Sequence, residues 1–246
     1  MSTSLWVTHT NPQARLRLFC FPYAGGGASI FRLWKQHFPA DIDICPVQLP
    51  GRENRLKEPP FVHLAPLVDA VAHEIAPLLD RPFALFGHSM GALISFELVR
   101  ALRRQQEREP AYLFVSAHRA PQFPMSRDIL HDLPAPAFLR SVYRMGGTPP
   151  AVLLNQELMR LMLPMLRADF TVNETYTYEE EPPLALPITA FGGEQDTLVS
   201  KRELQGWNAQ TSNVFASRIL PGDHFFLQSS REMLLAIIAQ ELAMLR

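Results

Sequence analysis

The chain has 246 residues, of which 47% are hydrophobic and 19% charged, and its formal net charge is −1. This length allows one large domain or two small ones, and the apolar fraction is sufficient for a substantial core. The near-neutral charge argues against nucleic acid and anionic membrane surfaces as partners. Cys20 and Cys45 lie within apolar runs, so we expect reduced, buried thiols in a cytoplasmic protein rather than a disulfide.

The sequence contains neither a recognisable targeting segment nor a metal or nucleotide motif. Residues 1–6 lack the charged start and apolar run of a secretory signal. No stretch approaches the roughly 18 apolar residues that a membrane span needs. Cysteine and histidine residues lack metal-ligand spacing, and neither a G-x-G-x-x-G motif nor a phosphate loop occurs. We therefore expect no bound metal and no cofactor.

Strand signals alternate with helical periodicities along most of the chain. Strands are expected at 15–21, 41–47, 82–86, 112–117, 186–191 and 217–220. Helices are expected around 31–38, 64–79, 93–102, 201–209 and 231–245. Arginines lie near the end of the third of these helices, at 100, 103, 104 and 108, and we expect them to form a solvated helix end. The alternation predicts an α/β fold with a mostly parallel sheet and helices on both faces.

The stretch between Ala117 and Leu186 is far longer than the dozen or so residues that a crossover connection requires. Its apolar residues recur at helical spacing, which predicts two or three short helices packed over the functional end of the sheet. Methionines at 159, 162 and 165 are expected to be packing residues. We therefore divide the chain into an α/β core, 1–121 and 186–246, and a helical lid insertion, 122–185.

A candidate nucleophile follows the expected strand at 82–86. Residues 87–91 read Gly-His-Ser-Met-Gly, a G-x-S-x-G pattern between a strand and a helix. Such a turn exposes the serine hydroxyl, and Gly87 and Gly91 have no Cβ to block the close approach of strand and helix. The pattern indicates Ser89 as a nucleophile, although a glycine-rich turn with a capping serine would read the same way.

A serine needs a base, and the base needs an acceptor that fixes its tautomer. The chain order Ser, Asp, His is typical of α/β-hydrolases, and Ser89, Asp196 and His224 provide it, the latter two after strands that end near 191 and 220. Glu194 is the alternative acid in the same turn. His118 is the reserve base, and His88 is expected to point away from the serine hydroxyl.

Two backbone amides are expected to stabilise the oxyanion that forms during acyl transfer. The first is the Met90 N–H, at the start of the helix after Ser89. The second belongs to the loop Tyr23-Ala24-Gly25 after the first strand, where we select Ala24. This glycine loop could also be a simple tight turn.

Several motifs in order resemble type II thioesterases, the stand-alone editing enzymes of nonribosomal peptide and polyketide assembly lines. They are Phe21-Pro22-Tyr23-Ala24-Gly25-Gly26, Gln48-Leu49-Pro50-Gly51-Arg52-Glu53, Gly87-His88-Ser89-Met90-Gly91, Arg119-Ala120-Pro121, Leu166-Arg167-Ala168-Asp169-Phe170, Gly192-Gly193-Glu194-Gln195-Asp196 and Gly222-Asp223-His224-Phe225-Phe226. The resemblance implies an α/β-hydrolase fold with a small helical lid. It also implies a Ser89–His224–Asp196 triad, with Met90 and Ala24 as oxyanion donors.

The resemblance implies hydrolysis of acyl groups from the phosphopantetheine arm of acyl- or peptidyl-carrier proteins. The arm belongs to the substrate, so no cofactor is expected, and the expected enzyme is a cytoplasmic monomer. Three alternatives remain at this stage. They are a general small-molecule esterase, a carrier acyltransferase, and a non-catalytic module that binds carrier domains.

Overall fold

The computed structural model describes residues 6–7, 11–125, 128–147 and 155–245. The expectation about a targeting segment therefore falls largely outside the described residues. The described residues form a six-stranded sheet with the order β2-β1-β3-β4-β5-β6, in which each neighbouring pair is parallel. Its strands are β1 (Leu16–Phe21), β2 (Ile42–Pro46), β3 (Phe83–His88), β4 (Tyr112–Ser116), β5 (Ile188–Gly193) and β6 (Phe215–Leu220). The predicted α/β fold is confirmed.

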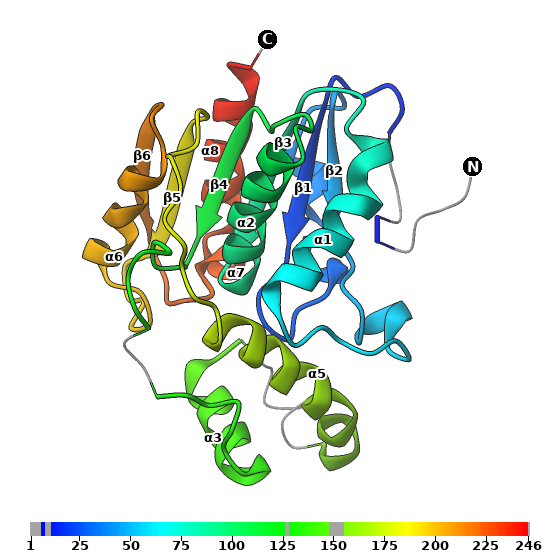
Figure 1. The fold of residues 1–246 in the computed structure, drawn as a ribbon, viewed down its shortest axis with the longest axis vertical. Coiled ribbons are helices and arrows are strands. Elements are labelled where there is room, and N and C mark those ends of the chain that lie inside the picture. The colour runs from blue at the N-terminus through cyan, green and yellow to red at the C-terminus, as the bar shows by residue number, and fades with distance from the viewer. Residues whose placement is uncertain (1–5, 8–10, 126–127, 148–154, 246) are drawn as a thin grey trace.

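Helices cover both faces of the sheet, as Figure 1 shows. The α-helices of the described residues are α1 (Leu64–Ile75), α2 (Met90–Arg104), α3 (Ala135–Met145), α5 (Gln156–Glu174), α6 (Lys201–Gln205), α7 (Phe226–Ser229) and α8 (Arg231–Ala243). Helices α1 and α2 lie on one face and α8 on the other. The carboxyl-terminal end of α8 lies at the end of the sheet opposite to α3 and α5 (Figure 1).

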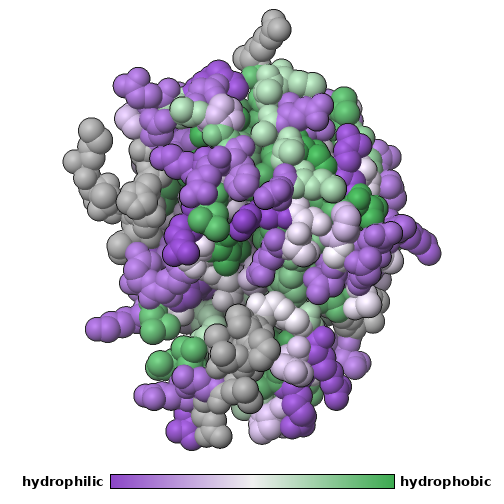
Figure 2. Space-filling model, turned by 180° about the vertical axis from the view of Figure 1, so that it is seen from behind, coloured by the Kyte–Doolittle hydropathy of each residue, from purple (hydrophilic) through white to green (hydrophobic). Residues whose placement is uncertain are grey.

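Alternate residues of each strand pack into two separate apolar layers, because successive side chains point to opposite faces of a sheet. Phe19 and Phe21 of β1 pack into the layer that contains α1 and α2. Leu16, Leu18 and Cys20 pack into the layer that contains α8. The surface on the α8 side mixes hydrophobic and hydrophilic side chains (Figure 2). Cys20 and Cys45 are both buried free thiols, as predicted, and burial raises the pKa of each well above its ordinary value.

The prediction of a helix at 31–38 is wrong. The chain instead forms two short 3₁₀ turns, Ala28–Phe31 and Trp34–His37. A 3₁₀ turn places residues three apart on one side. Phe31 and Trp34 have this spacing, and both rings pack edge-on against Phe86. Phe31 ends the first turn and Trp34 begins the second, so both rings are buried at the junction of the two turns.

Helices α3 and α5 lie beyond the carboxyl ends of the strands (Figure 1). They share a small apolar cluster that includes Phe138, Met159 and Met165, which confirms the packing role expected for the methionines. The expectation of short helices is wrong for α5, which has 19 residues. Its length has a physical reason, because its far end buries Val172 in the main core. The lid boundaries at 122 and 185 stay a prediction, and residues 126–127 and 148–154 lie outside the described part.

Candidate active site

The turn between β3 and α2 holds Ser89 in an unusual backbone conformation, with φ at +53°. Its N–H donates to the Ser116 carbonyl at 2.7 Å, which ties the turn to β4. A Cβ on Gly87 would lie 2.0 Å from the Gly91 carbonyl oxygen, and a Cβ on Gly91 would lie 2.2 Å from that of Phe21. Real Cβ atoms do not approach backbone so closely. Both glycines are therefore required for the strand and the helix to meet at this turn.

Three side chains from distant parts of the chain contact one another in series. The His224 Nε2 atom lies 3.1 Å from the Ser89 Oγ atom. The opposite ring nitrogen, Nδ1, lies 2.9 Å from Asp196 Oδ2. A carboxylate only accepts hydrogen bonds, so it favours a proton on Nδ1 and leaves Nε2 able to accept the serine proton. The arrangement can activate a hydroxyl nucleophile.

The turn after β5 separates the two candidate acids. The Asp196 side chain is fully buried, and its Oδ1 accepts hydrogen bonds from the amides of Leu198 and Val199 at 2.7 and 3.2 Å. These bonds hold the carboxylate in place behind the imidazole. Glu194 is exposed, and its carboxylate contacts the Gln195 side chain instead. The structure therefore brings Asp196, and not Glu194, to His224.

The buried His88 ring points away from the serine hydroxyl, as predicted. Its Nε2–H donates to the His224 carbonyl, and the Ser116 hydroxyl donates to its Nδ1, both at 2.9 Å. Burial, together with the nearby His224 ring, lowers the pKa of His88 well below its usual value. His88 is therefore a neutral ring whose hydrogen bond holds the backbone carbonyl of His224 in place. Sequence reasoning missed Ser116, although its place at the carboxyl end of β4 was a usable signal.

A cavity of about 80 Å³ opens at the serine. Ser89, His224, Met90 and Ala24 all line it, so both expected oxyanion donors lie at the candidate nucleophile. Val142 and Met145 of α3 and Phe170 of α5 also line it. The cavity therefore combines a polar reacting end with an apolar wall.

The reserve base His118 also lines this cavity. Its Nδ1–H donates to the Arg119 carbonyl at 2.7 Å, and its Nε2 lies 3.2 Å from Asn173 Oδ1. These contacts orient the ring toward the lid helix α5, while His224 is the histidine that reaches Ser89. Asn173 was not foreseen, because no local pattern links it to a strand end.

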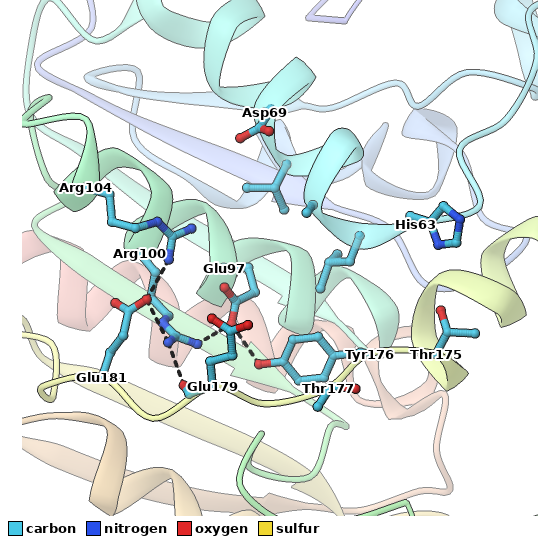
Figure 3. Close-up of a pocket in the computed structure, with 13 residues that line it drawn as sticks. His63, Asp69, Glu97, Arg100, Arg104, Thr175, Tyr176, Thr177, Glu179 and Glu181 are labelled. Atoms are coloured by element: carbon cyan, nitrogen blue, oxygen red, sulfur yellow. Dashed lines mark hydrogen bonds and ion pairs between the residues drawn. The ribbon is translucent and has the colours of Figure 1, made fainter.

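A larger hollow, of about 410 Å³, lies between α1, α2 and residues 175–181, and it shares no lining residue with the cavity at Ser89 (Figure 3). Four of its ionisable groups, Arg100, Arg104, Glu97 and Glu181, form one ion-paired network. The Arg100 guanidinium contacts Glu97 and Glu181 at 2.6 and 2.8 Å, and Tyr176 donates to Glu97. The arginine and glutamate side chains of the hollow therefore compensate each other's charge, unlike His224, which contacts a hydroxyl.

The same network corrects the expectation of a solvated arginine cluster. Arg100 is only 2% exposed, because Glu97 and Glu181 compensate its buried charge. Arg103 and Arg104 also contact Glu181, each at 2.6 Å. Arg108 is exposed, as expected. Through Glu181, the arginines of α2 thus hold the segment that follows α5 against helix α2.

Among the described residues, no group of three or more His, Cys, Asp or Glu side chains is placed to hold a metal ion. In the same part of the chain, no helix is long and apolar enough to cross a membrane.

Comparison with known proteins identifies the family. A family model described as a thioesterase domain matches residues 16–242. The gramicidin S biosynthesis protein GrsT of Aneurinibacillus migulanus is 47% identical over 234 residues, which cover 95% of this chain and 91% of GrsT.

Solved structures similar to this chain are also thioesterases. RedJ, a thioesterase of the prodiginine biosynthetic pathway in Streptomyces coelicolor, matches with a TM-score of 0.88 and 41% identity over 93% of this chain and 91% of RedJ. YbtT, a type II thioesterase from the yersiniabactin NRPS/PKS pathway, matches with a TM-score of 0.84 and 31% identity over 94% of each chain. These matches confirm the resemblance to type II thioesterases and the α/β-hydrolase fold. The chain therefore belongs to the thioesterase family, as a thioester hydrolase.

Proposed function

We propose that this thioesterase hydrolyses acyl groups from the phosphopantetheine arm of carrier proteins, and so clears stalled or misprimed groups from an assembly line. The observation that carries the proposal is the contact series from Ser89 through His224 to Asp196 at the mouth of a cavity. The names of GrsT and YbtT, which refer to gramicidin S biosynthesis and to an NRPS/PKS pathway, support the choice of substrate.

In the first half-reaction, Ser89 Oγ attacks the thioester carbonyl carbon while His224 Nε2 takes its proton. The carbon–sulfur bond then breaks, and the imidazolium returns the proton to the departing pantetheine sulfur. The products are a free thiol on the carrier arm and an acyl group esterified to Ser89. Asp196 stabilises the imidazolium that forms between the two proton transfers.

In the second half-reaction, water replaces the serine as the nucleophile. His224 takes a proton from the water as it attacks the ester carbonyl, and then returns a proton to Ser89 Oγ as the ester bond breaks. The products are the carboxylic acid and the free serine. Both tetrahedral intermediates place negative charge on the former carbonyl oxygen, toward which the Met90 and Ala24 amides would donate.

A carrier acyltransferase and a general esterase would use the same serine. An acyltransferase of this motif lacks the acidic third member, which here contacts His224 as Asp196. We further propose that the enzyme is a cytoplasmic monomer, that it needs no metal or cofactor, and that carrier domains are its partners. Neither a nucleic acid nor a membrane is part of this proposal.

The decisive experiment compares wild type and Ser89→Ala on a panel of acyl-loaded carrier proteins and on small-molecule esters. We expect wild type to release acyl groups from carriers faster than it cleaves the esters. Ser89→Ala should lose turnover by at least ~10³-fold, because no other group supplies the nucleophile. Ser212→Ala is the matched control, since the Ser212 hydroxyl contacts the Leu184 carbonyl away from the cavity.

Turnover by Ser89→Ala within tenfold of wild type would contradict the assignment of the nucleophile. Faster cleavage of the small esters than of acyl-carriers would favour a general esterase. Transfer of the acyl group to a second thiol, with no free acid formed, would favour an acyltransferase.

A further inference from the structure

The motifs without a role in the mechanism above include Gln48–Glu53 after β2 and Leu166–Phe170 on the lid helix α5. The structure joins them through one buried ion pair. Arg52 Nη1 lies 2.7 Å from Asp169 Oδ2, and Arg52 Nη2 lies 2.8 Å from Asp169 Oδ1. The Arg52 and Asp169 side chains are only 5% and 4% exposed. Two parallel hydrogen bonds of this kind fix direction as well as distance.

The pair also holds the backbone of the loop that contains Ala24. The Gly25 amide donates to Asp169 Oδ2 at 2.7 Å, and Arg52 Nη1 donates to the Gly26 carbonyl at 3.2 Å. Arg52 Nε is in turn anchored on the Pro50 carbonyl at 3.1 Å. The carboxylate and the guanidinium therefore contact the two residues that directly follow Ala24.

These contacts determine the direction of the Ala24 N–H. The Gly26 amide donates to the Tyr23 carbonyl at 2.8 Å. Tyr23 C=O and Ala24 N–H belong to the same planar trans peptide and point in opposite directions. Once Gly25 and Gly26 are held by Asp169 and Arg52, the tight turn fixes this peptide plane, and with it the Ala24 donor.

Helix α5 packs directly on the same loop. Gly25 has φ at +82°, and a Cβ there would lie 2.5 Å from Leu166 Cδ2, one turn before Asp169. Leu166 is itself buried in the cluster shared by the lid helices. The lid helix thus contacts the loop through an apolar side chain and a carboxylate on neighbouring turns.

We propose that Asp169 and Arg52 are positioning residues, which transmit the placement of the lid helix α5 to the Ala24 oxyanion donor. The inference rests on the proposed function, in which Ala24 N–H stabilises the oxyanion. It assigns neither residue a contact with substrate. Arg52 also balances the Asp169 charge, which would otherwise oppose a developing oxyanion nearby.

The test uses Asp169→Asn and Arg52→Lys. The first substitution keeps the size of the side chain but removes the charged two-point contact. The second keeps the charge, but an ammonium group cannot reach two carboxylate oxygens and the Gly26 carbonyl together. Loss of a whole oxyanion donor costs about 10²–10³ in rate, so we expect a misdirected donor to lower kcat on acyl-pantetheine by about tenfold or more. We expect KM to change by less than about twofold, because the donor acts in the transition state.

A second readout does not depend on turnover. A phenylboronic acid forms a tetrahedral adduct with an active-site serine, and one boronate oxygen occupies the oxyanion position. We expect its dissociation constant to rise in both variants by a factor similar to the loss of kcat. If one variant does not fold, the other provides both readouts.

Glu174→Gln is the matched control, because it also removes a buried carboxylate from α5. Glu174 accepts hydrogen bonds from the amides of Leu130 and His131 within the lid, and not from the loop at Ala24. We expect a lower melting temperature with kcat and boronate affinity retained. An equal loss in this control would overturn the proposal, because general loosening of the lid would then explain all three variants.

Folded Asp169→Asn and Arg52→Lys proteins with kcat and boronate affinity within twofold of wild type would also overturn it. The proposed function fails separately, if wild type itself does not hydrolyse acyl-pantetheine or if Ser89→Ala does. In that case boronate titration of the wild type and of the two variants still decides whether Asp169 and Arg52 position the loop.

Discussion

The hollow beside α2 and the cavity at Ser89 both contain ionisable side chains, but their contacts differ in kind. In the hollow, the Glu181 carboxylate contacts Arg100, Arg103 and Arg104. In the cavity, His224 has a carboxylate on one nitrogen and only a hydroxyl on the other. In the larger space the arginine and glutamate side chains thus neutralise each other, whereas in the smaller one a histidine nitrogen contacts a serine hydroxyl. Size alone would have selected the wrong site.

Among substitutions that test this difference between the two cavities, Asp196→Asn should have the largest effect, a loss of kcat. The amide can present an N–H to His224 Nδ1, which favours the tautomer with its proton on Nε2, where the serine proton must go. We expect kcat to fall by about 10³–10⁴, with little change in melting temperature. Glu194→Gln removes a neighbouring exposed carboxylate and should leave kcat near that of wild type. A loss below tenfold for Asp196→Asn would remove Asp196 from the mechanism.

The next effect should come from Gly91→Ala, which tests whether backbone contact sets the geometry of the reactive cavity. The new Cβ would meet the Phe21 carbonyl oxygen at 2.2 Å, so β1 and α2 must separate. We expect a loss of about 3 kcal/mol in the free energy of unfolding, measured by urea denaturation. Gly192→Ala is the control, since its Cβ would first meet the flexible end of Leu204 at 2.9 Å. An equal or greater loss in Gly192→Ala would contradict this explanation.

The smallest effect should come from Glu181→Gln in the hollow. We expect a loss of about 1–3 kcal/mol in the free energy of unfolding at pH 7, with kcat on acyl-carriers unchanged. Glu180→Gln, at an adjacent exposed carboxylate, should change neither quantity. A tenfold loss of kcat in Glu181→Gln would show that the two cavities are coupled.

Glu181→Gln should also change how the stability of the protein depends on pH. Burial alone would raise the pKa of Glu181, but hydrogen bonds from Arg100, Arg103 and Arg104 lower it from 4.5 to about 2. A carboxyl group whose pKa is lower in the folded state stabilises the protein above its unfolded pKa, and this stability is lost as the pH falls. Wild type should therefore lose stability between about pH 4.5 and pH 2 more steeply than Glu181→Gln. Parallel acid unfolding curves would contradict the ion-pair assignment.

The sequence predicted the features that depend on strand ends. Parallel strands bring their carboxyl ends to one edge, so Ser89, Asp196 and His224 could be expected to meet although 135 positions separate Ser89 from His224. The contacts are as expected, and the catalytic roles stay a prediction that the Ser89 and Asp196 variants test. Strands β1 to β5 could be located because their mostly apolar residues are almost all buried, whereas most of β6 is half-buried or exposed.

Features that depend on pairing across the fold could not be predicted. Arg100 looked like part of a solvated helix end, because its partner Glu181 lies on a distant loop. Asp169 and the Gly25 amide are 144 positions apart, and neither local pattern indicates the other. The prediction of an α-helix at 31–38 failed for a different reason. The spacing of Phe31 and Trp34 fits both a 3₁₀ turn and an α-helix, so it could not distinguish the two.

The position of α8 has a practical consequence. Its last turn lies at the end of the sheet farthest from the lid helices (Figure 1). An affinity tag, a fluorescent reporter or a solid support joined to the chain after Ala243 would therefore project away from the serine. Bulky protein substrates could then approach an immobilised enzyme from the opposite side without competing with its tether.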